Sequence, residues 1–277
     1  MQCYVIDAFS DKIFGGNPAA VCVCERWLDD ALLQKIASEH NLSETAFCVP
    51  QPKNATYQLR WFTPAGEIDL CGHATLATGF IVMNFIDSAA QQVAFETKSG
   101  ILQVRKMGDK YEIDLPSFAL NPLALTKERI EQIYAAIGFA PIEAYLGRDL
   151  VCVLENEQQV RDCTPDMSKV LELEGVLCHI TARGDSIKSE STQGLLNFDC
   201  VSRSFAPKHG VSEDPVCGSG HCHLVPLWSK KLGKAQILAY QASKRGGVLE
   251  CRDNGARVSL AGNAVLYSTN TIALENA

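Results

Sequence analysis

An internal repeat constrains the fold of this chain more than any other feature of its sequence. The stretch "RWFTPAGEIDLCGHA" begins at Arg60, and "RSFAPKHGVSEDPVCGSGH" begins at Arg203. Both read Arg-x-Phe-x-Pro, then a glycine, acidic residues and Cys-Gly, although the second is three residues longer between its Phe and its Cys. A chain of 277 residues has room for one or two domains. The repeat therefore predicts two domains of common design, each burying a central helix under a curved sheet.

The composition indicates a folded protein and argues against several classes of function. Hydrophobic residues make up 47% and charged residues 21% of the chain, which is enough apolar material for real cores. A net charge of -7 with no long basic run argues against nucleic-acid binding. The longest apolar stretch, residues 74–86, is too short to span a bilayer, and the N-terminal stretch lacks the pattern of a signal peptide. We therefore expect a cytoplasmic protein that binds neither nucleic acid nor membrane.

The cysteines divide into two groups. There are 12, and many lie in apolar runs such as "AAVCVC" and "DLVCVL". A chain of this size does not need disulfides to be stable, so most are interpreted as reduced, buried, small apolar residues of a cytosolic protein. Cys71 and Cys217 are the exceptions, because they occupy matching places in the repeat.

Short strands and a few helices are expected along the chain. Alternating or β-rich runs predict strands at 3–9, 19–24, 56–62, 92–97, 101–106 and 111–116. Helical spacing and caps predict helices at 29–40, 72–85, 126–138 and 223–233. Pro226 lies inside the last of these and is expected in its first turns or at a kink. The loop-like segment 116–126 is a reasonable domain boundary.

Each repeated cysteine precedes a predicted helix, Cys71 directly and Cys217 with Gly-Ser-Gly after it, where an apolar run begins. A helix N-terminus offers unpaired N–H groups and a positive dipole end, and glycine there lets an anion approach the backbone. A small carboxylate is therefore expected to bind at the residues of these two helix starts. They are Gly72 in the first motif, and Gly218, Ser219 and Gly220 in the second. The same field favours thiolate, so each cysteine would be a better base or nucleophile than a free one. Two such ends facing each other across a domain cleft would suit moving a proton off a carbon and back.

Other groups that can handle protons lie near these motifs. Glu44, in "NLSETAF", follows a predicted helix and begins a strand, where a carboxylate can act as a general base. A solvated loop carboxylate or a cap is an equally open interpretation of Glu44. His73 begins an apolar segment and Asp214 precedes a proline, so packing and turn roles are open for both. Asn17 is a candidate binding residue that also fits a turn.

At these residues the chain resembles the phenazine-biosynthesis (PhzF-like) isomerases, which share the diaminopimelate epimerase fold. The motifs that carry the resemblance are "DAF…GNPAAV", "LSETAF", "FTP…CGHAT" and "FAP…VSEDPVCGSG", in family order across nearly the whole chain. The resemblance implies an α+β fold of two pseudo-symmetric domains, each a mixed β-sheet rolled around a central helix, with the active site between them. We place the N-terminal domain at residues 1–117, with residues 265–277 returning to it, and the C-terminal domain at 118–264.

The resemblance also implies roles for individual residues. It makes Glu44 the proton shuttle, His73 and Asp214 its partners, and Ser219 a residue that touches the substrate. It further implies a homodimer that needs no metal or organic cofactor. The chain departs from the pattern at its repeated cysteines, because the phenazine enzyme has none there, whereas diaminopimelate epimerase uses both as acid and base.

Two catalytic hypotheses follow from this mixed pattern. In the first, an isomerase shifts a proton between carbons of a small cyclic or unsaturated carboxylate or amino acid, with Glu44 as the base. In the alternative, a cofactor-independent racemase or epimerase uses Cys71 and Cys217 on opposite faces of an α-carbon. Two further interpretations are a zinc site built from the cysteines and histidines of the two motifs, and a binding protein without catalysis. Metal is not expected, because no pair of ligands has a recognised zinc spacing.

Overall fold

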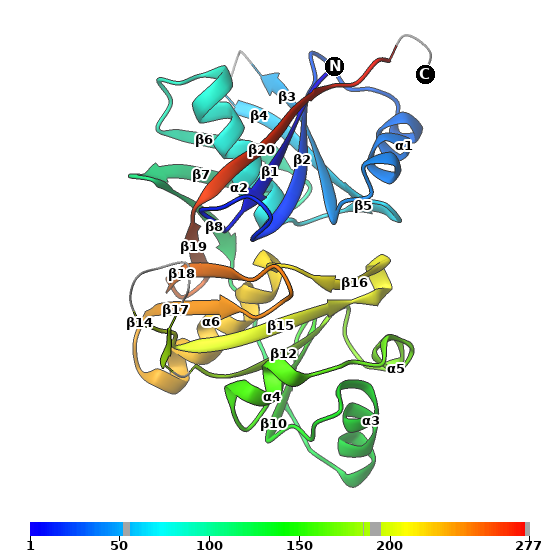
Figure 1. Ribbon diagram of the computed structural model, residues 1–277, viewed down its shortest axis with the longest axis vertical. Coiled ribbons are helices and arrows are strands. Elements are labelled where there is room, and N and C mark those ends of the chain that lie inside the picture. The colour runs from blue at the N-terminus through cyan, green and yellow to red at the C-terminus, as the bar shows by residue number, and fades with distance from the viewer. Residues whose placement is uncertain (52–55, 185, 189–194, 275–277) are drawn as a thin grey trace. The chain divides into compact units, whose positions relative to one another are not determined.

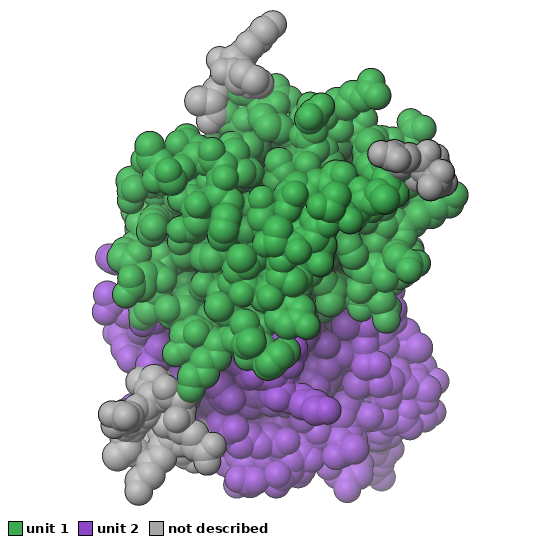
Figure 2. Space-filling model, turned by 45° about the horizontal axis from the view of Figure 1, so that its top comes forward, with its two compact units in different colours: residues 1–115, 260–277 green, residues 116–259 purple. Residues whose placement is uncertain are grey.

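The chain forms two compact units in a computed structural model, which describes residues 1–51, 56–184, 186–188 and 195–274. Unit 1 comprises Met1–Leu115 with Leu260–Ala277, and unit 2 comprises Pro116–Ser259 (Figure 2). Among the described residues, no helix has both the length and the apolar character needed to cross a membrane.

Unit 1 is a mixed sheet with two helices and a short π-helical turn. Its strands are β1 (Gln2–Ala8), β2 (Asn17–Val23), β3 (Glu44–Gln51), β4 (Thr56–Thr63), β5 (Gly66–Ile68), β6 (Gln92–Thr97), β7 (Gly100–Met107), β8 (Lys110–Pro116) and β20 (Ala264–Thr271). Its helices are α1 (Asp30–His40), α2 (Gly72–Ile81) and the π-helical η1 (Val82–Ile86). The sheet runs in the order β20-β1-β2-β3-β4-β6-β7-β8, and β5 pairs with the free part of β4. The pairs β2–β3 and β4–β6 are parallel, and the others are antiparallel.

Unit 2 repeats this design. Its strands are β9 (Asn121–Leu123), β10 (Glu143–Leu146), β11 (Leu150–Val153), β12 (Cys178–Arg183), β15 (Cys200–Ala206), β16 (Val211–Asp214), β17 (Gln236–Gln241) and β18 (Gly247–Asp253), followed by β19 (Arg257–Gly262). Its helices are α3 (Lys127–Ile137), α4 (Glu157–Asp162), α5 (Met167–Glu172), η2 (Pro207–His209) and α6 (Gly218–Leu232). The order is β9-β10-β11-β12-β15-β17-β18, again with two parallel pairs, β11–β12 and β15–β17. A separate hairpin joins β13 (Ser186–Lys188) and β14 (Leu195–Asn197).

The shared strand order confirms the predicted pseudo-symmetry. Parallel neighbours need a crossover connection, and both units place helices there. In unit 1, α1 joins β2 to β3 and α2 joins β4 to β6; in unit 2, α4 and α5 join β11 to β12, and α6 joins β15 to β17 (Figure 1). The longer second motif contains the helical turn η2, between β15 and β16. The repeat in the sequence is therefore a repeat in topology.

The arginine that opens each motif supports the hairpin beside it. Arg60 makes a two-pronged ion pair with Glu67, and Arg203 makes the same pair with Glu213. Each guanidinium also lies over the phenylalanine ring two residues further on, 5.1 Å and 5.2 Å from the ring centre. These contacts give both arginines a structural role within their own unit.

Helix α2 is apolar nearly all round and lies inside unit 1, as its sequence predicts. All of its residues except Phe80 are buried, and it contacts β1, β2, β3, β7 and β20. Gly79 lets α2 approach β7 closely, because a Cβ at this position would lie 2.5 Å from Val104 Cγ1. The close fit positions the start of α2, which carries two candidate site residues.

The last helix differs from its prediction in one respect. Helix α6 begins at Gly218, earlier than expected, so Pro226 lies in its interior rather than in its first turns. A proline has no N–H, so the carbonyl four residues earlier loses its helical partner. That carbonyl belongs to Cys222, and it accepts a hydrogen bond from Phe118 N at 3.0 Å instead. The proline is tolerated because a neighbouring segment donates a hydrogen bond to the carbonyl that has lost its helical partner.

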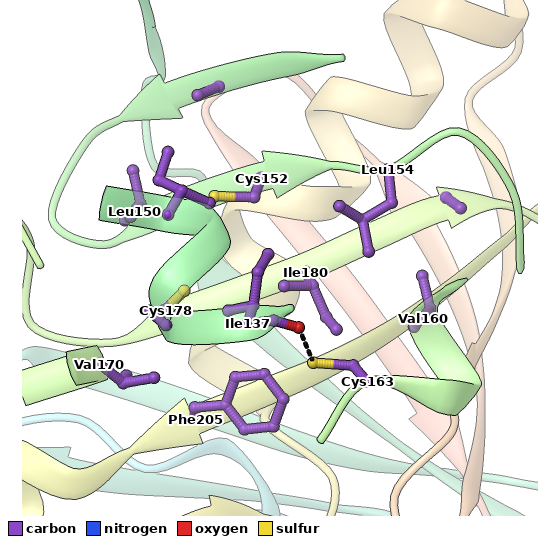
Figure 3. Packing of buried hydrophobic residues seen from close by; sticks show 14 of the residues in the cluster. Ile137, Leu150, Cys152, Leu154, Val160, Cys163, Val170, Cys178, Ile180 and Phe205 are labelled. Atoms are coloured by element: carbon purple, nitrogen blue, oxygen red, sulfur yellow. Dashed lines mark hydrogen bonds between the residues drawn. The ribbon is translucent and has the colours of Figure 1, made fainter. Parts of the chain in front are cut away.

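Buried cysteines fill part of the core of unit 2. Cys152, Cys163 and Cys178 pack among aliphatic side chains and Phe205, and Cys163 Sγ donates to Ile137 O at 3.1 Å (Figure 3). All 12 cysteines lie among the described residues, are buried, and take part in no disulfide there. Most of them are small apolar core residues, as predicted.

Candidate active site

A carboxylate and an imidazole meet in unit 1. Glu44 is the first residue of β3, and His73 is the second residue of α2. Glu44 Oε2 lies 3.1 Å from His73 Nε2. The His73 side chain is buried, whereas the Glu44 side chain keeps 12% of its surface exposed. The carboxylate is therefore held by a buried group and can still reach a ligand.

Asn17 determines which ring nitrogen of His73 carries the proton. Its Nδ2 lies 3.0 Å from His73 Nδ1. Because an amide nitrogen only donates, Nδ1 accepts, and the proton of a neutral imidazole lies on Nε2. This N–H faces the Glu44 carboxylate. The predicted residues Asn17, His73 and Glu44 thus form one chain of polar contacts.

Cys71 completes this group. It is the N-cap of α2, is buried, and places its Sγ 3.6 Å from His73 Nδ1. The ligand atoms of Cys71, His73 and Glu44 all lie within 4.8 Å of one another. Thiolate, imidazole and carboxylate are ligands that zinc accepts, so these three side chains could hold such an ion. This set differs from the zinc set considered from the sequence, since Glu44 joins it.

The second motif shapes the start of α6 in unit 2. Cys217 is the N-cap of the helix, and its Sγ accepts a hydrogen bond from Gly220 N at 3.3 Å. Cys217 N donates to Gln241 Oε1 at 2.8 Å, and Gln241 Nε2 donates to Asp214 O at 2.6 Å. Asp214 Oδ1 accepts from Val216 N at 3.1 Å, which closes the turn before the helix. Asp214 within this segment and Gln241 at the end of β17 therefore hold the start of the helix in place.

Cys217 does not have the ionisation predicted for it. Burial and the negative charge of Asp214 raise the pKa of Cys217 well above its usual range, against hydrogen bonds from Ser219 and Gly220 N. The helix terminus was expected to favour thiolate, but the cost of removing a charge from water is larger than the field of one helix end. Cys217 is therefore a neutral thiol near pH 7.

A buried network beneath the start of α6 was missed from the sequence. Asp149, immediately before β11, is fully buried. Its Oδ2 lies 3.1 Å from His179 Nε2, 3.0 Å from Arg148 Nη2 and 3.5 Å from His223 Nε2, and its Oδ1 accepts from Leu177 N at 3.2 Å. Apart from the adjacent Arg148, the partners come from two distant parts of the chain, around Leu177 and at His223, so no local motif marks them.

The charges of this network are settled by burial and by hydrogen bonds. Burial alone would raise the pKa of Asp149, but hydrogen bonds from His179 and His223 and the charge of Arg148 hold it well below its usual range. Burial lowers the pKa of His179, which is therefore neutral. Asp149 accepts from His179 Nε2–H, and His179 Nδ1 accepts from the Ser204 hydroxyl at 2.9 Å.

Through this network, unit 2 fixes the Ser219 hydroxyl. Arg148 Nη2 donates to Ser219 Oγ at 3.1 Å while it is held by Asp149. Gly220 packs directly on the His179 ring, since a Cβ there would lie 2.7 Å from His179 Cε1. Arg148 and Asp149 are thus positioning residues for the first turn of α6.

The two units carry different chemistry at equivalent places. Phe62 pairs with Thr45 in unit 1 and Phe205 pairs with Cys178 in unit 2, so Glu44 corresponds to Leu177. The residue two positions after the repeated cysteine is His73 in unit 1 and Ser219 in unit 2. Unit 1 therefore has a carboxylate and an imidazole where unit 2 has an apolar side chain and a hydroxyl.

Because His221 is buried, we predict that the free energy of unfolding depends on pH. Burial lowers the pKa of His221 from 6.5 to about 4, against the hydrogen bond that its Nδ1 donates to Cys217 O at 2.7 Å. Between these values the unfolded chain binds a proton that the folded chain does not, so the free energy of unfolding rises with pH. His179 contributes with the same sign. We expect the His221 contribution to fall by about 1–2 kcal/mol as the pH is lowered from roughly 6.5 to 5.

Urea unfolding at several pH values measures this effect. In His221→Asn the amide keeps a donor for Cys217 O but does not titrate, so its stability should change less over the same acid range. An unchanged pH dependence in the variant would contradict the assignment.

Comparisons with known proteins show the family and the fold of this chain. The family model described as "Phenazine biosynthesis-like protein" (PhzC-PhzF) matches residues 6–270. An uncharacterized isomerase of Pseudomonas aeruginosa is 43% identical over 274 residues, which cover 99% of each chain. The crystal structure of a PhzF-family phenazine biosynthesis protein from Enterococcus faecalis superposes with a TM-score of 0.89 at 44% identity, over 99% of each chain.

A more distant structure shares the fold alone. A hydroxyproline epimerase from Agrobacterium vitis has a TM-score of 0.61 at 10% identity, over 100% of this chain and 93% of the other. The two-unit architecture is therefore that of the diaminopimelate epimerase-like proteins.

Proposed function

Because the chain belongs to the phenazine biosynthesis-like (PhzC-PhzF) family and is an enzyme of the isomerase class, we propose that it moves a proton between carbons of a small carboxylate or amino acid, with Glu44 as the general base. The observation that carries this proposal is the buried contact between Glu44 Oε2 and His73 Nε2 at 3.1 Å. It places a carboxylate that keeps some exposed surface against a buried imidazole.

Each residue of the group has a proposed role. Glu44 removes a proton from a carbon that the substrate's carboxylate or double bond makes acidic, and returns it to another carbon. His73 Nε2 lies against one Glu44 oxygen, which leaves the other oxygen to receive the substrate proton. Asn17 keeps His73 in the tautomer that makes this possible.

The start of α6 provides binding groups in the same proposal. The N–H groups of a helix N-terminus favour a carboxylate, and Gly218, Ser219 and Gly220 stand there in α6. The Ser219 hydroxyl is held by Arg148, so its position at the start of the helix is fixed. Two residue roles stay predictions: Gly72 as a binding residue, and Asp214 as a residue that orients the substrate or tunes the base. An active site between the domains, a homodimer and a cytoplasmic setting also stay predictions.

The alternative chemistry uses Cys71 and Cys217 as a pair of acid and base. Both are N-caps of the central helices, as that mechanism requires. The raised pKa of Cys217 weakens it as the base that starts the reaction, although a neutral thiol can still donate a proton. We therefore rank this mechanism second.

Hydrogen exchange tests the proposal even though the substrate is unidentified. The protein is incubated with a pooled set of small carboxylates and amino acids in deuterated water, and mass spectrometry finds the compound that gains carbon-bound deuterium. We expect such a compound, and we expect Cys217→Ser to keep most of the exchange. Loss of exchange in Cys217→Ser, with retention in Glu44→Gln, would overturn the assignment in favour of the cysteine pair.

A further inference from the structure

A sulfur-rich cluster lies in unit 1, outside the candidate active site. Cys3 and Cys22 belong to the core beneath α1, together with Cys24 and the partly buried Met1. The Cys22 thiol donates to Cys3 Sγ across 3.2 Å. His40, the last residue of α1, places Nε2 3.8 Å from Cys3 Sγ. The cluster thus has two thiols in contact and an imidazole beside one of them.

The strand register suits a bond between these sulfurs. Cys3 on β1 and Cys22 on β2 are directly opposite in an antiparallel pair. Directly opposite residues have Cα atoms about 4.5–5.5 Å apart, which lies within the range of about 4.4–6.8 Å found for disulfides. Small changes in the two side-chain rotamers would therefore bring the sulfurs to bonding distance without moving the strands.

The imidazole and the neighbouring thiol make Cys3 the reactive partner. The hydrogen bond from Cys22 and the nearby His40 lower the pKa of Cys3 to about 6, against the opposing effect of burial. Burial raises the pKa of Cys24 to about 11 and that of Cys222 to about 12. His40 Nδ1 also contacts Thr45 Oγ1 at 3.2 Å, which fixes the ring so that Nε2 faces the sulfur. A thiolate is the form that attacks peroxides.

Shared ligation of a metal fits this spacing less well. The ligand atoms of Cys3, Cys22 and His40 do lie within 4.8 Å of one another. Two sulfurs bound to one tetrahedral zinc, each about 2.3 Å from it, lie about 3.8 Å apart. The observed 3.2 Å is shorter and favours a bond between the sulfurs.

We propose that Cys3 and Cys22 form a peroxide-sensitive thiol pair that closes to a reversible disulfide. The Cys3 thiolate attacks hydrogen peroxide, breaks its O–O bond, and becomes a sulfenic acid while hydroxide leaves. The Cys22 sulfur then attacks the Cys3 sulfur, forming the S–S bond, and the departing hydroxyl takes the Cys22 proton to leave as water. In total, peroxide is reduced to two molecules of water by the two thiols. Both cysteines lie near the ends of their strands, where local opening admits a small oxidant.

The test is peptide mapping of the native protein after treatment with stoichiometric hydrogen peroxide. The free thiols are blocked with iodoacetamide in denaturant, and the protein is digested without reductant. We expect one Cys3–Cys22 link, a loss of about 2 Da in the intact mass, and full reversal by dithiothreitol. The chain supplies an internal control in Cys152 and Cys178, an equally buried pair of neighbouring thiols in which the pKa of Cys178 is raised well above its usual range by Cys152 and by burial (Figure 3).

Variants separate the two steps. Cys22→Ser should leave a sulfenic acid on Cys3 that dimedone labels, whereas Cys3→Ser should leave Cys22 unmodified. His40→Asn should slow formation of the link by about tenfold, because less of Cys3 would be thiolate. The proposal is overturned if the native protein forms no Cys3–Cys22 link, if Cys152–Cys178 links equally fast, or if stoichiometric zinc binds and protects both thiols.

Discussion

Replacing Glu44 with glutamine is expected to lower the rate of carbon–hydrogen exchange by about 10²–10⁴-fold. Glutamine keeps the size and most of the polarity of the side chain, but its amide does not accept a proton at neutral pH. The amide oxygen can still lie against His73 Nε2, so the local structure should be retained. The loss would then report proton transfer rather than misfolding.

The measurement is the rate of deuterium incorporation into the substrate found by the pooled experiment, together with the melting temperature of each variant. Cys217→Ser is the matched control, because it changes one atom of a residue that the proposal does not use as the base. If Glu44→Gln exchanged deuterium as fast as the wild-type protein, Glu44 would not be the base.

Replacing Asp149 with alanine is expected to lower the free energy of unfolding by about 3–5 kcal/mol. The carboxylate is the shared partner of His179 and Arg148, and it accepts a hydrogen bond from Leu177 N. Its removal would leave buried donors without a partner and a guanidinium without its counter-ion. Few single substitutions in this chain combine full burial with so many polar partners.

Urea unfolding of the purified variants measures this loss. Asp149→Asn keeps the side-chain volume and an acceptor for Leu177 N, so it should cost about 1–2 kcal/mol. Asp30→Ala is the surface control, because Asp30 pairs with Arg60 while 74% of its side chain is exposed, and no measurable change is expected. Equal stability of Asp149→Ala and wild type would show that the network does not stabilise unit 2.

Local patterns in the sequence were sufficient to predict several elements. Thr126 caps α3 through a hydrogen bond from Arg129 N, and Gly138 ends the helix in the left-handed conformation, as the sequence indicated. Such signals are readable because a cap and a stop involve residues within one turn of each other. Pro226 does not lie in the first turns of α6, the first of its two predicted places, because the cysteine motif itself forms the first turn.

The residues of the candidate site could be predicted from the sequence, but the contacts between them could not. Glu44, His73 and Asn17 stand out singly in the sequence, yet their meeting depends on the parallel pairing of β2 with β3 and on the crossover that α2 makes. The network around Asp149 joins residues 30 and 74 positions apart in the chain, so only the fold reveals it.

By itself, the sequence determined the two-fold design, the family, and the residue types at the start of each central helix, because repeats and caps are encoded by near neighbours. Tertiary structure decided which thiols ionise. Cys217 stands at a helix start that should favour thiolate, yet burial raises its pKa, while Cys3 stands in an ordinary strand and has its pKa lowered by Cys22 and His40. Burial and charge at a sulfur are set by side chains that only folding brings together, and these outweigh the local field that the sequence displays.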